Sequence, residues 1–199
     1  MDLQVSVFLL FAAFTSGYSL SCYQCDGILG SCAEQTEKTC SSEQSKCASI
    51  TVVRKFGTTS STTKAKDCAA DCASGILNFG YSKMSHVCCN SDQCNKKDAQ
   101  VPTTDTPNGN TCYSCNENNC FNVLSCSGNE DRCIKATVTV RSMSAVVKGC
   151  ASKSICDAKS VPSLHDISCC SGNLCNGAKS VTQSFLILCF PLIAFILML

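Results

Sequence analysis

Two stretches of the sequence share one pattern of cysteines. Residues 87–95 read VCCNSDQCN, and residues 168–176 read SCCSGNLCN. In each stretch two adjacent cysteines are followed, five residues after the second, by a third cysteine with an asparagine directly behind it. The recurrence of so specific a pattern predicts that the chain contains the same structural unit twice.

The cysteines ahead of each stretch repeat as well. Of the 21 cysteines, ten lie in residues 22–94 and ten in residues 112–175. Successive gaps are 3, 7, 8, 7, 21, 4, 16, 1 and 5 in the first set and 3, 5, 6, 7, 17, 6, 13, 1 and 5 in the second. The gaps agree at both ends and differ in the middle, which predicts fixed cross-links joined by loops of variable length.

The cysteine content also predicts the compartment. With 21 cysteines in 199 residues, the chain is typical of disulfide scaffolds formed on an oxidising, extracellular route. Units of roughly 65 to 75 residues have marginal hydrophobic cores and are usually stabilised by cross-links. A disulfide that closes a loop of about 25 residues stabilises the fold by about 3 kcal/mol in the chain-entropy model.

The amino-terminal segment predicts a signal peptide over residues 1–19. An apolar run, VSVFLLFAAF, covers residues 5–14, and the small residues Gly17 and Ser19 provide a cleavage site after Ser19. Asp2 stands where a signal peptide usually has a basic residue.

Residues 185–199 form a second apolar run, FLILCFPLIAFILML. Fifteen residues are fewer than the roughly 20 that span a bilayer, and no Lys or Arg follows the run as it would follow a stop-transfer helix. Together with the small residues near Asn176 and the polar spacer after them, the run predicts a glycosylphosphatidylinositol (GPI) attachment signal. We expect attachment at Asn176, or as second choice at Gly177, and removal of residues 177–199 as a propeptide. A marginal tail anchor and a secreted form remain alternatives.

Between the two units, residues 96–111 (KKDAQVPTTDTPNGNT) are rich in Thr, Pro, Asn and Gly and contain no large apolar side chains. They predict a flexible linker whose end-to-end distance averages about 20 Å. Its threonines Thr103, Thr104 and Thr106 are candidate O-glycan sites. Residues 49–56, 136–140 and 142–148 carry the β-branched and alternating patterns of strands in hairpins.

The opening motifs Cys22-Tyr-Gln-Cys25 and Cys112-Tyr-Ser-Cys115, with the two closing motifs, resemble those of the three-finger family. This family includes lymphocyte antigen 6 proteins, the urokinase plasminogen activator receptor and snake neurotoxins. The resemblance implies an all-β, disulfide-rich chain with two tandem three-finger, snake-toxin-like domains, at residues 20–95 and 112–176. It also implies that Asn95 and Asn176 tie the carboxyl end of each domain into its disulfide core.

Cysteine spacing alone leaves 945 pairings open for ten cysteines, so the connectivity is taken from the resemblance. The implied disulfides are Cys22–Cys47, Cys25–Cys32, Cys40–Cys68, Cys72–Cys88 and Cys89–Cys94 in the first domain, and Cys112–Cys133, Cys115–Cys120, Cys126–Cys150, Cys156–Cys169 and Cys170–Cys175 in the second.

The resemblance further implies a non-enzymatic protein on the extracellular face of the plasma membrane, held in the outer leaflet by its lipid and recognising an extracellular protein ligand or co-receptor through its finger loops. We expect Arg54, Lys55 and Phe56 near the tip of finger two, and Phe79 and Tyr81 in finger three, to contact that partner. Ordinary packing and solvation of these residues is the alternative. The alternative functions are a secreted two-domain inhibitor resembling phospholipase A2 inhibitors, or a modulator of a surface receptor or of complement.

Other chemistries are disfavoured by the sequence. The net charge is +1, which gives no basic surface for nucleic acid. Cys-x2-Cys pairs also occur in zinc sites, but an oxidising route favours disulfides, so neither a metal nor a cofactor is expected. His86 and His165 are expected to be solvated, and no nucleophile motif accompanies them. The sequence therefore does not predict an enzyme.

Overall fold

The computed structural model describes residues 19–27, 32–102, 106–116, 119–140, 142–161 and 164–177. Most of the predicted signal peptide, the propeptide from residue 178 onward, Thr103 and Thr104 lie outside these ranges. Within the described ranges no helix has the length and apolarity needed to cross a bilayer.

The first domain consists of three antiparallel hairpins. The strands are β1 (Ser21–Asp26) with β2 (Thr36–Thr39), β3 (Lys46–Phe56) with β4 (Thr59–Ala69), and β5 (Gly75–Asn78) with β6 (Ser82–Cys89). The β3–β4 hairpin is the longest of the three, and Gly57 turns its tip with a φ of 60°, which glycine adopts at no steric cost. The strand predicted at residues 49–56 lies within β3.

The second domain repeats this plan with one change. It contains β7 (Pro107–Ser114) with β8 (Asn122–Ser127), and β9 (Arg132–Val140) with β10 (Met143–Ala151). Among the described residues, its third finger has one strand, β11 (Leu164–Cys170), preceded by the short helix α2 (Lys153–Cys156). The predicted all-β, two-domain three-finger fold is confirmed.

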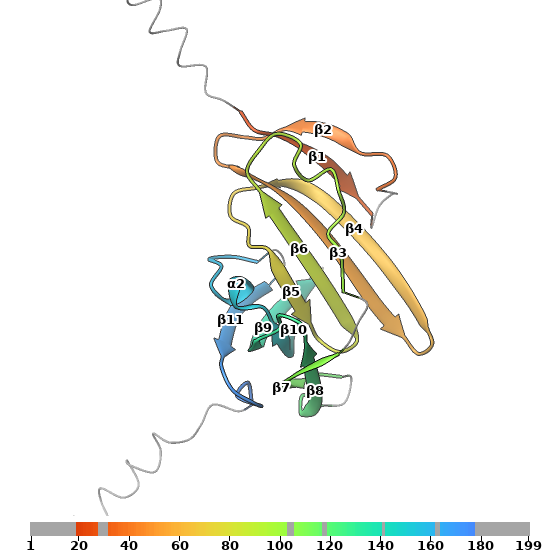
Figure 1. The fold of residues 1–199 in the computed structure, drawn as a ribbon, viewed down its shortest axis with the longest axis vertical. Helices are drawn as coiled ribbons and strands as arrows, with labels where there is room; N and C mark the ends of the chain where they lie inside the picture. The colour runs from red at the N-terminus through yellow and green to blue at the C-terminus, as the bar shows by residue number, and fades with distance from the viewer. Residues whose placement is uncertain are drawn as a thin grey trace, which may run out of the picture.

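Strand pairing continues from one domain into the other (Figure 1). The strand order of the main sheet is β11-β9-β10-β5-β6-β3-β4-β1-β2, and the junction is the pair formed by β5 and β10. Cys150 pairs with Asn78 and Ala151 with Leu77. Ser152 extends the contact, because its N–H donates to the carbonyl of Ile76 at 2.9 Å.

The junction also carries the main hydrophobic core of the molecule. Two of its buried members come from finger three of the first domain and six from the second domain: Leu77, Phe79, Ile134, Ala136, Val147, Ala151, Ile155 and Val161. Gly149 allows the two strands to approach, because a Cβ atom there would collide with the carbonyl oxygen of Asn78. The two domains therefore share one core.

The described parts of the segment between the domains, residues 96–102 and 106–111, are not the flexible coil that the composition predicts. The Asp98 carboxylate lies 2.7 Å from the Lys64 ammonium and 2.9 Å from that of Lys66, and hydrogen bonds from these two lysines lower its pKa. Ala99 is buried and its N–H donates to the Ser49 hydroxyl at 3.0 Å. At the other end, residues 107–111 already belong to β7. The expectation fails because these ion pairs join residues that are distant in the sequence.

His86 is not solvated, contrary to expectation. Its side chain is 4% exposed, its Nε2 lies 3.1 Å from the Met84 sulfur, and burial lowers its pKa from 6.5 to about 4. His165 on β11 is exposed, as expected. The apolar surroundings of His86 come from cross-strand neighbours, which local sequence does not identify.

The buried histidine predicts a specific pH dependence of stability. The unfolded chain protonates His86 near pH 6.5 while the folded chain resists protonation down to about pH 4, so stability falls as the pH drops through this window. We expect a loss of about 1 kcal/mol between pH 7 and 5.5, measured by guanidinium unfolding with the disulfides intact. His86→Gln should abolish this loss and His165→Gln should retain it. Equal pH slopes in the native protein and His86→Gln would contradict the assignment.

Candidate functional site

Each domain is closed by an asparagine that follows its last cysteine. In the first domain Asn95 Nδ2 donates to the carbonyls of Tyr23 and Ala48 at 2.8 and 3.0 Å, and its Oδ1 accepts from the Tyr23 N–H at 2.9 Å. In the second domain Asn176 makes the equivalent bonds with Tyr113 and with the carbonyl of Ile134. Both side chains are buried. A buried amide satisfied in this way fixes the carboxyl end of its domain to the first strand.

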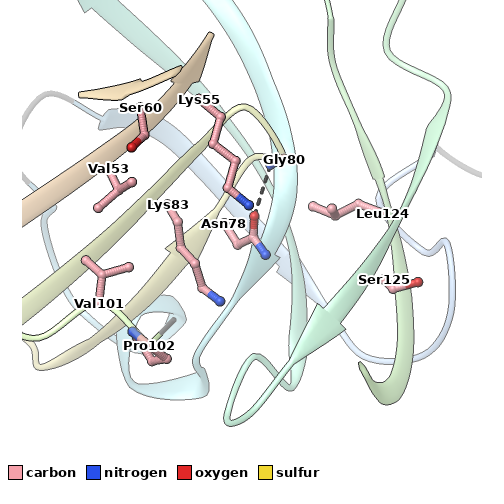
Figure 2. A pocket seen from close by; sticks show the side chains of 10 residues that line it. All are labelled: Val53, Lys55, Ser60, Asn78, Gly80, Lys83, Val101, Pro102, Leu124 and Ser125. Carbon is pink, nitrogen blue, oxygen red and sulfur yellow. Dashed lines mark hydrogen bonds between the residues drawn. The ribbon is translucent and has the colours of Figure 1, made fainter. Parts of the chain in front are cut away.

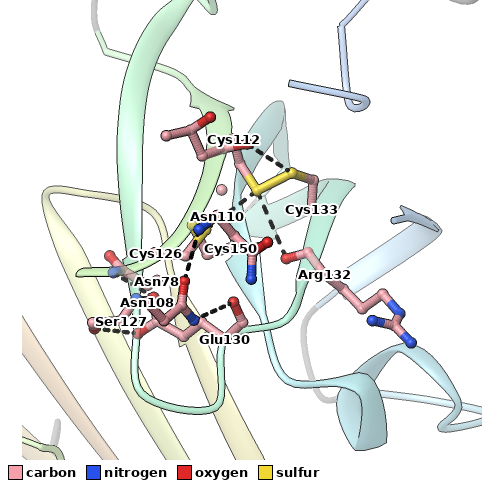
Figure 3. Close-up of a disulfide and its surroundings, with 12 residues drawn as sticks. Asn78, Asn108, Asn110, Cys112, Cys126, Ser127, Glu130, Arg132, Cys133 and Cys150 are labelled. Carbon is pink, nitrogen blue, oxygen red and sulfur yellow. Dashed lines mark hydrogen bonds between the residues drawn. A yellow bond between two sulfur atoms is a disulfide. The ribbon is translucent and has the colours of Figure 1, made fainter. Parts of the chain in front are cut away.

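The structure joins the ten cysteine pairs that the resemblance implies. In each domain two of the bonds cross at the centre, with sulfurs of different disulfides in contact: Cys22 with Cys40 at 3.2 Å, and Cys112 with Cys126 at 3.4 Å. Figure 3 shows the Cys112–Cys133 bond of the second domain beside the polar groups of the junction.

These crossings also bring three sulfurs together in each domain, Cys22 with Cys40 and Cys68, and Cys112 with Cys126 and Cys150. Metal binding by cysteine requires the thiolate. Each of these sulfurs is already bonded to another sulfur, so the two groups offer disulfide cores and no thiolate ligands.

Beside the second crossing lies a buried polar network that spans the junction (Figure 3). Glu130, 1% exposed, accepts hydrogen bonds from Asn78 Nδ2 and from the Ser127 N–H, each at 3.0 Å. Its carboxylate also lies 3.1 Å from the ammonium of Lys83 in the first domain. Removing one partner of such a pair would leave a buried charge without compensation, so the network holds the domains in one orientation.

The two domains enclose a groove on this side of the junction. It consists of two adjoining hollows of about 430 and 730 Å³ that share Lys55 and Gly80. Figure 2 shows the smaller hollow, in which Val53 and Lys55 of β3 and Leu124 of β8 come from different domains. The larger hollow continues to the aromatic residues of the first domain and to Val146 of β10. The lining is mainly apolar.

Four of the five residues expected to contact a partner line the larger hollow: Lys55, Phe56, Phe79 and Tyr81. Phe56 and Tyr81 are 62% and 47% exposed. Arg54 is exposed on the same hairpin but is not part of the lining. Alternation along β3 places Arg54 on the face opposite to Val53 and Lys55, which line the hollows, whereas Phe56 reaches the larger hollow from the end of the strand.

Phe79 requires a correction. The side chain is 7% exposed and belongs to the core shared by the domains. It forms the floor of the groove and cannot serve as a protruding contact residue, because its apolar surface is already covered by the second domain.

Several lining residues were not identified from the sequence. Val101 and Pro102 come from the segment between the domains, Leu124 from β8, and Val146 from β10. The strand pattern at residues 142–148 contained a signal, since an outward-facing Val146 beside a buried Val147 indicates apolar surface on both faces of the strand. Which element lies opposite depends on the domain arrangement.

Comparison with known proteins agrees with this architecture. Residues 18–97 match the u-PAR/Ly-6 domain, and residues 111–176 match the family of snake toxin and toxin-like proteins. The chain belongs to this three-finger family. It is 28% identical to the urokinase plasminogen activator surface receptor of Mus musculus, over 82% of this chain and 57% of the receptor. The identity to the Rattus norvegicus receptor is 28%, over 82% of this chain and 56% of the receptor. The identity to the Bos taurus receptor is 33%, over 45% of this chain and 31% of the receptor. The chain thus spans a little over half the length of the rodent receptors.

Proposed function

We propose that this three-finger protein is a non-enzymatic, GPI-anchored cell-surface protein that binds an extracellular protein ligand in the groove between its domains. The observation that carries the proposal is that Lys55, Phe56 and Tyr81 of the first domain face one hollow with Val146 of the second. Aromatic side chains that remain exposed beside a concave apolar surface are typical anchor positions of protein interfaces.

The chemistry of the groove favours one kind of ligand segment. Its lining is mainly apolar with the exposed rings of Phe56 and Tyr81, and the ammonium of Lys83 is already paired with Glu130. A ligand segment with large apolar side chains would complement this surface. Urokinase, the ligand in the relatives' name, is not assigned to this chain, because the chain spans only part of those receptors.

Lipid attachment is compatible with the closure of the second domain. Transamidation moves the backbone carbonyl of Asn176 or Gly177 from the next residue's nitrogen to the ethanolamine of the lipid. The side-chain amide of Asn176 takes no part in this step, so its bonds to Tyr113 and Ile134 are retained.

Membrane attachment is tested by phosphatidylinositol-specific phospholipase C on cells that express the full chain. We expect the enzyme to release the protein into the medium. Retention after treatment would contradict a GPI anchor and favour a tail anchor, whereas spontaneous appearance in untreated medium would favour the secreted inhibitor.

The groove is tested by surface crosslinking and capture of the ligand with paired variants. Phe56→Ala combined with Tyr81→Ala removes two exposed aromatic side chains without opening the shared core, and we expect binding to weaken on the order of 100-fold. Arg54→Ala is the matched control, because Arg54 lies on the same hairpin outside the groove. Unchanged capture by the double variant, or equal loss with Arg54→Ala, would refute the groove as the binding site.

A further inference from the structure

Two of the large apolar side chains exposed on the second domain lie together near β8, outside the groove. Phe121, just before β8, is 63% exposed, and Val123 within β8 is 62% exposed. Neither lines the hollows, although their neighbours Asn122 and Leu124 do. Exposed apolar side chains that lie close together commonly mark a surface that is covered in the working state of a protein.

These side chains lie where the described chain ends. Val123 pairs with Tyr113 across the β7–β8 hairpin, and the rings of Tyr113 and Phe121 meet edge to face at 5.7 Å. Gly177 lies against the same tyrosine, since a Cβ atom there would be 3.3 Å from Tyr113 Cε2. Figure 1 shows β7, β8 and the end of the described chain at one end of the molecule and β1 and β2 at the other.

This end of the molecule carries few charges. Residues 107–116, 119–127 and 171–177 contain no Asp, Glu, Lys or Arg and are rich in Asn, Ser and Thr, while Glu117 lies in the sequence between the first two ranges. Such a surface loses little ionic solvation on contact with lipid headgroups, and its amides and hydroxyls can hydrogen-bond there.

The buried Lys148 contacts both aromatic rings. The Lys148 ammonium lies 5.1 Å from the centre of the Phe121 ring and 5.9 Å from that of Tyr113. Lys148 is 6% exposed, and its burial, with the charge of the neighbouring Lys135, lowers its pKa. The cation–π contacts orient Phe121 toward solvent before any partner arrives.

The sequence beyond Gly177 keeps this end close to a membrane. The apolar run begins at Phe185, eight residues further on, and eight residues span at most about 29 Å when fully extended. A lipid attached at Asn176 or Gly177 would leave almost no spacer.

From these observations we propose that the Phe121–Val123 surface rests on the lipid bilayer, with both side chains in the interfacial layer and Tyr113 at headgroup level. The inference rests on the proposed membrane attachment and adds which face of the protein meets the membrane. Aromatic residues with a polar edge favour this depth. The contact would hold the interdomain groove in a fixed orientation relative to the membrane surface.

The chain contains no tryptophan, so a single tryptophan reports its own environment. The experiment uses the full-length protein, purified from cells and reconstituted into vesicles of phosphatidylcholine and cholesterol, with or without acyl-chain bromination. Phe121→Trp should show blue-shifted emission and lose most of its intensity in brominated vesicles. Val87→Trp is the control, because Val87 is 42% exposed and lies two residues from Cys89, which packs on the disulfide core of the first domain.

The possible results are separable. Quenching of Phe121→Trp but not of Val87→Trp supports the proposal. Absence of quenching in protein that remains on the vesicles refutes the docking surface and leaves membrane attachment intact. Protein that does not remain on the vesicles overturns the attachment, and the inference falls with it. A blue shift that depends on protein concentration, without quenching by bromine, assigns the surface to a second copy of the chain and refutes lipid contact.

Discussion

The backbone pairing of β5 with β10 is the constraint on which the rest of the structure depends. Two residue pairs, Asn78 with Cys150 and Leu77 with Ala151, join strands of different domains into one sheet. The pairing packs Leu77 and Phe79 against the second domain, which contributes the other six of the eight buried core residues. Each domain alone is too small to bury a sizeable core. The disulfides fix each domain, and the junction makes the two domains one body.

The groove follows from this junction. Its walls belong to different domains, so its shape exists only while β5 and β10 stay paired. The buried Glu130 accepts from Asn78 and faces Lys83, which opposes rotation of one domain against the other. The end at Tyr113 and Gly177, which we propose rests on the membrane, lies on the second domain. A rigid junction therefore holds this end and the proposed ligand groove in a fixed geometry relative to each other.

Local sequence patterns were sufficient for the parts of the fold that are repeated. Cysteine spacing predicted two repeated units and strand alternation predicted their hairpins. The family resemblance supplied the three-finger fold, the disulfide pairing and the closing asparagines, which make the bonds expected of them. The junction was not predictable in the same way, because alternation indicates which face of a strand is apolar but not what covers it. Phe79 and Tyr81 were both interpreted as partner contacts, and Phe79 is instead used internally, in the core that the domains share. Glu130 and Lys83 are 47 residues apart, and nothing in the sequence selects one as the partner of the other.

The central claim is that the two domains move as one body, and ¹⁵N relaxation of residues 20–177 in solution tests it most directly. The account predicts a single rotational correlation time for both domains. It also predicts that Gly149→Ala, which places a Cβ atom against the Asn78 carbonyl, separates them into two units with shorter and different correlation times. Two independent correlation times in the native protein would contradict the account.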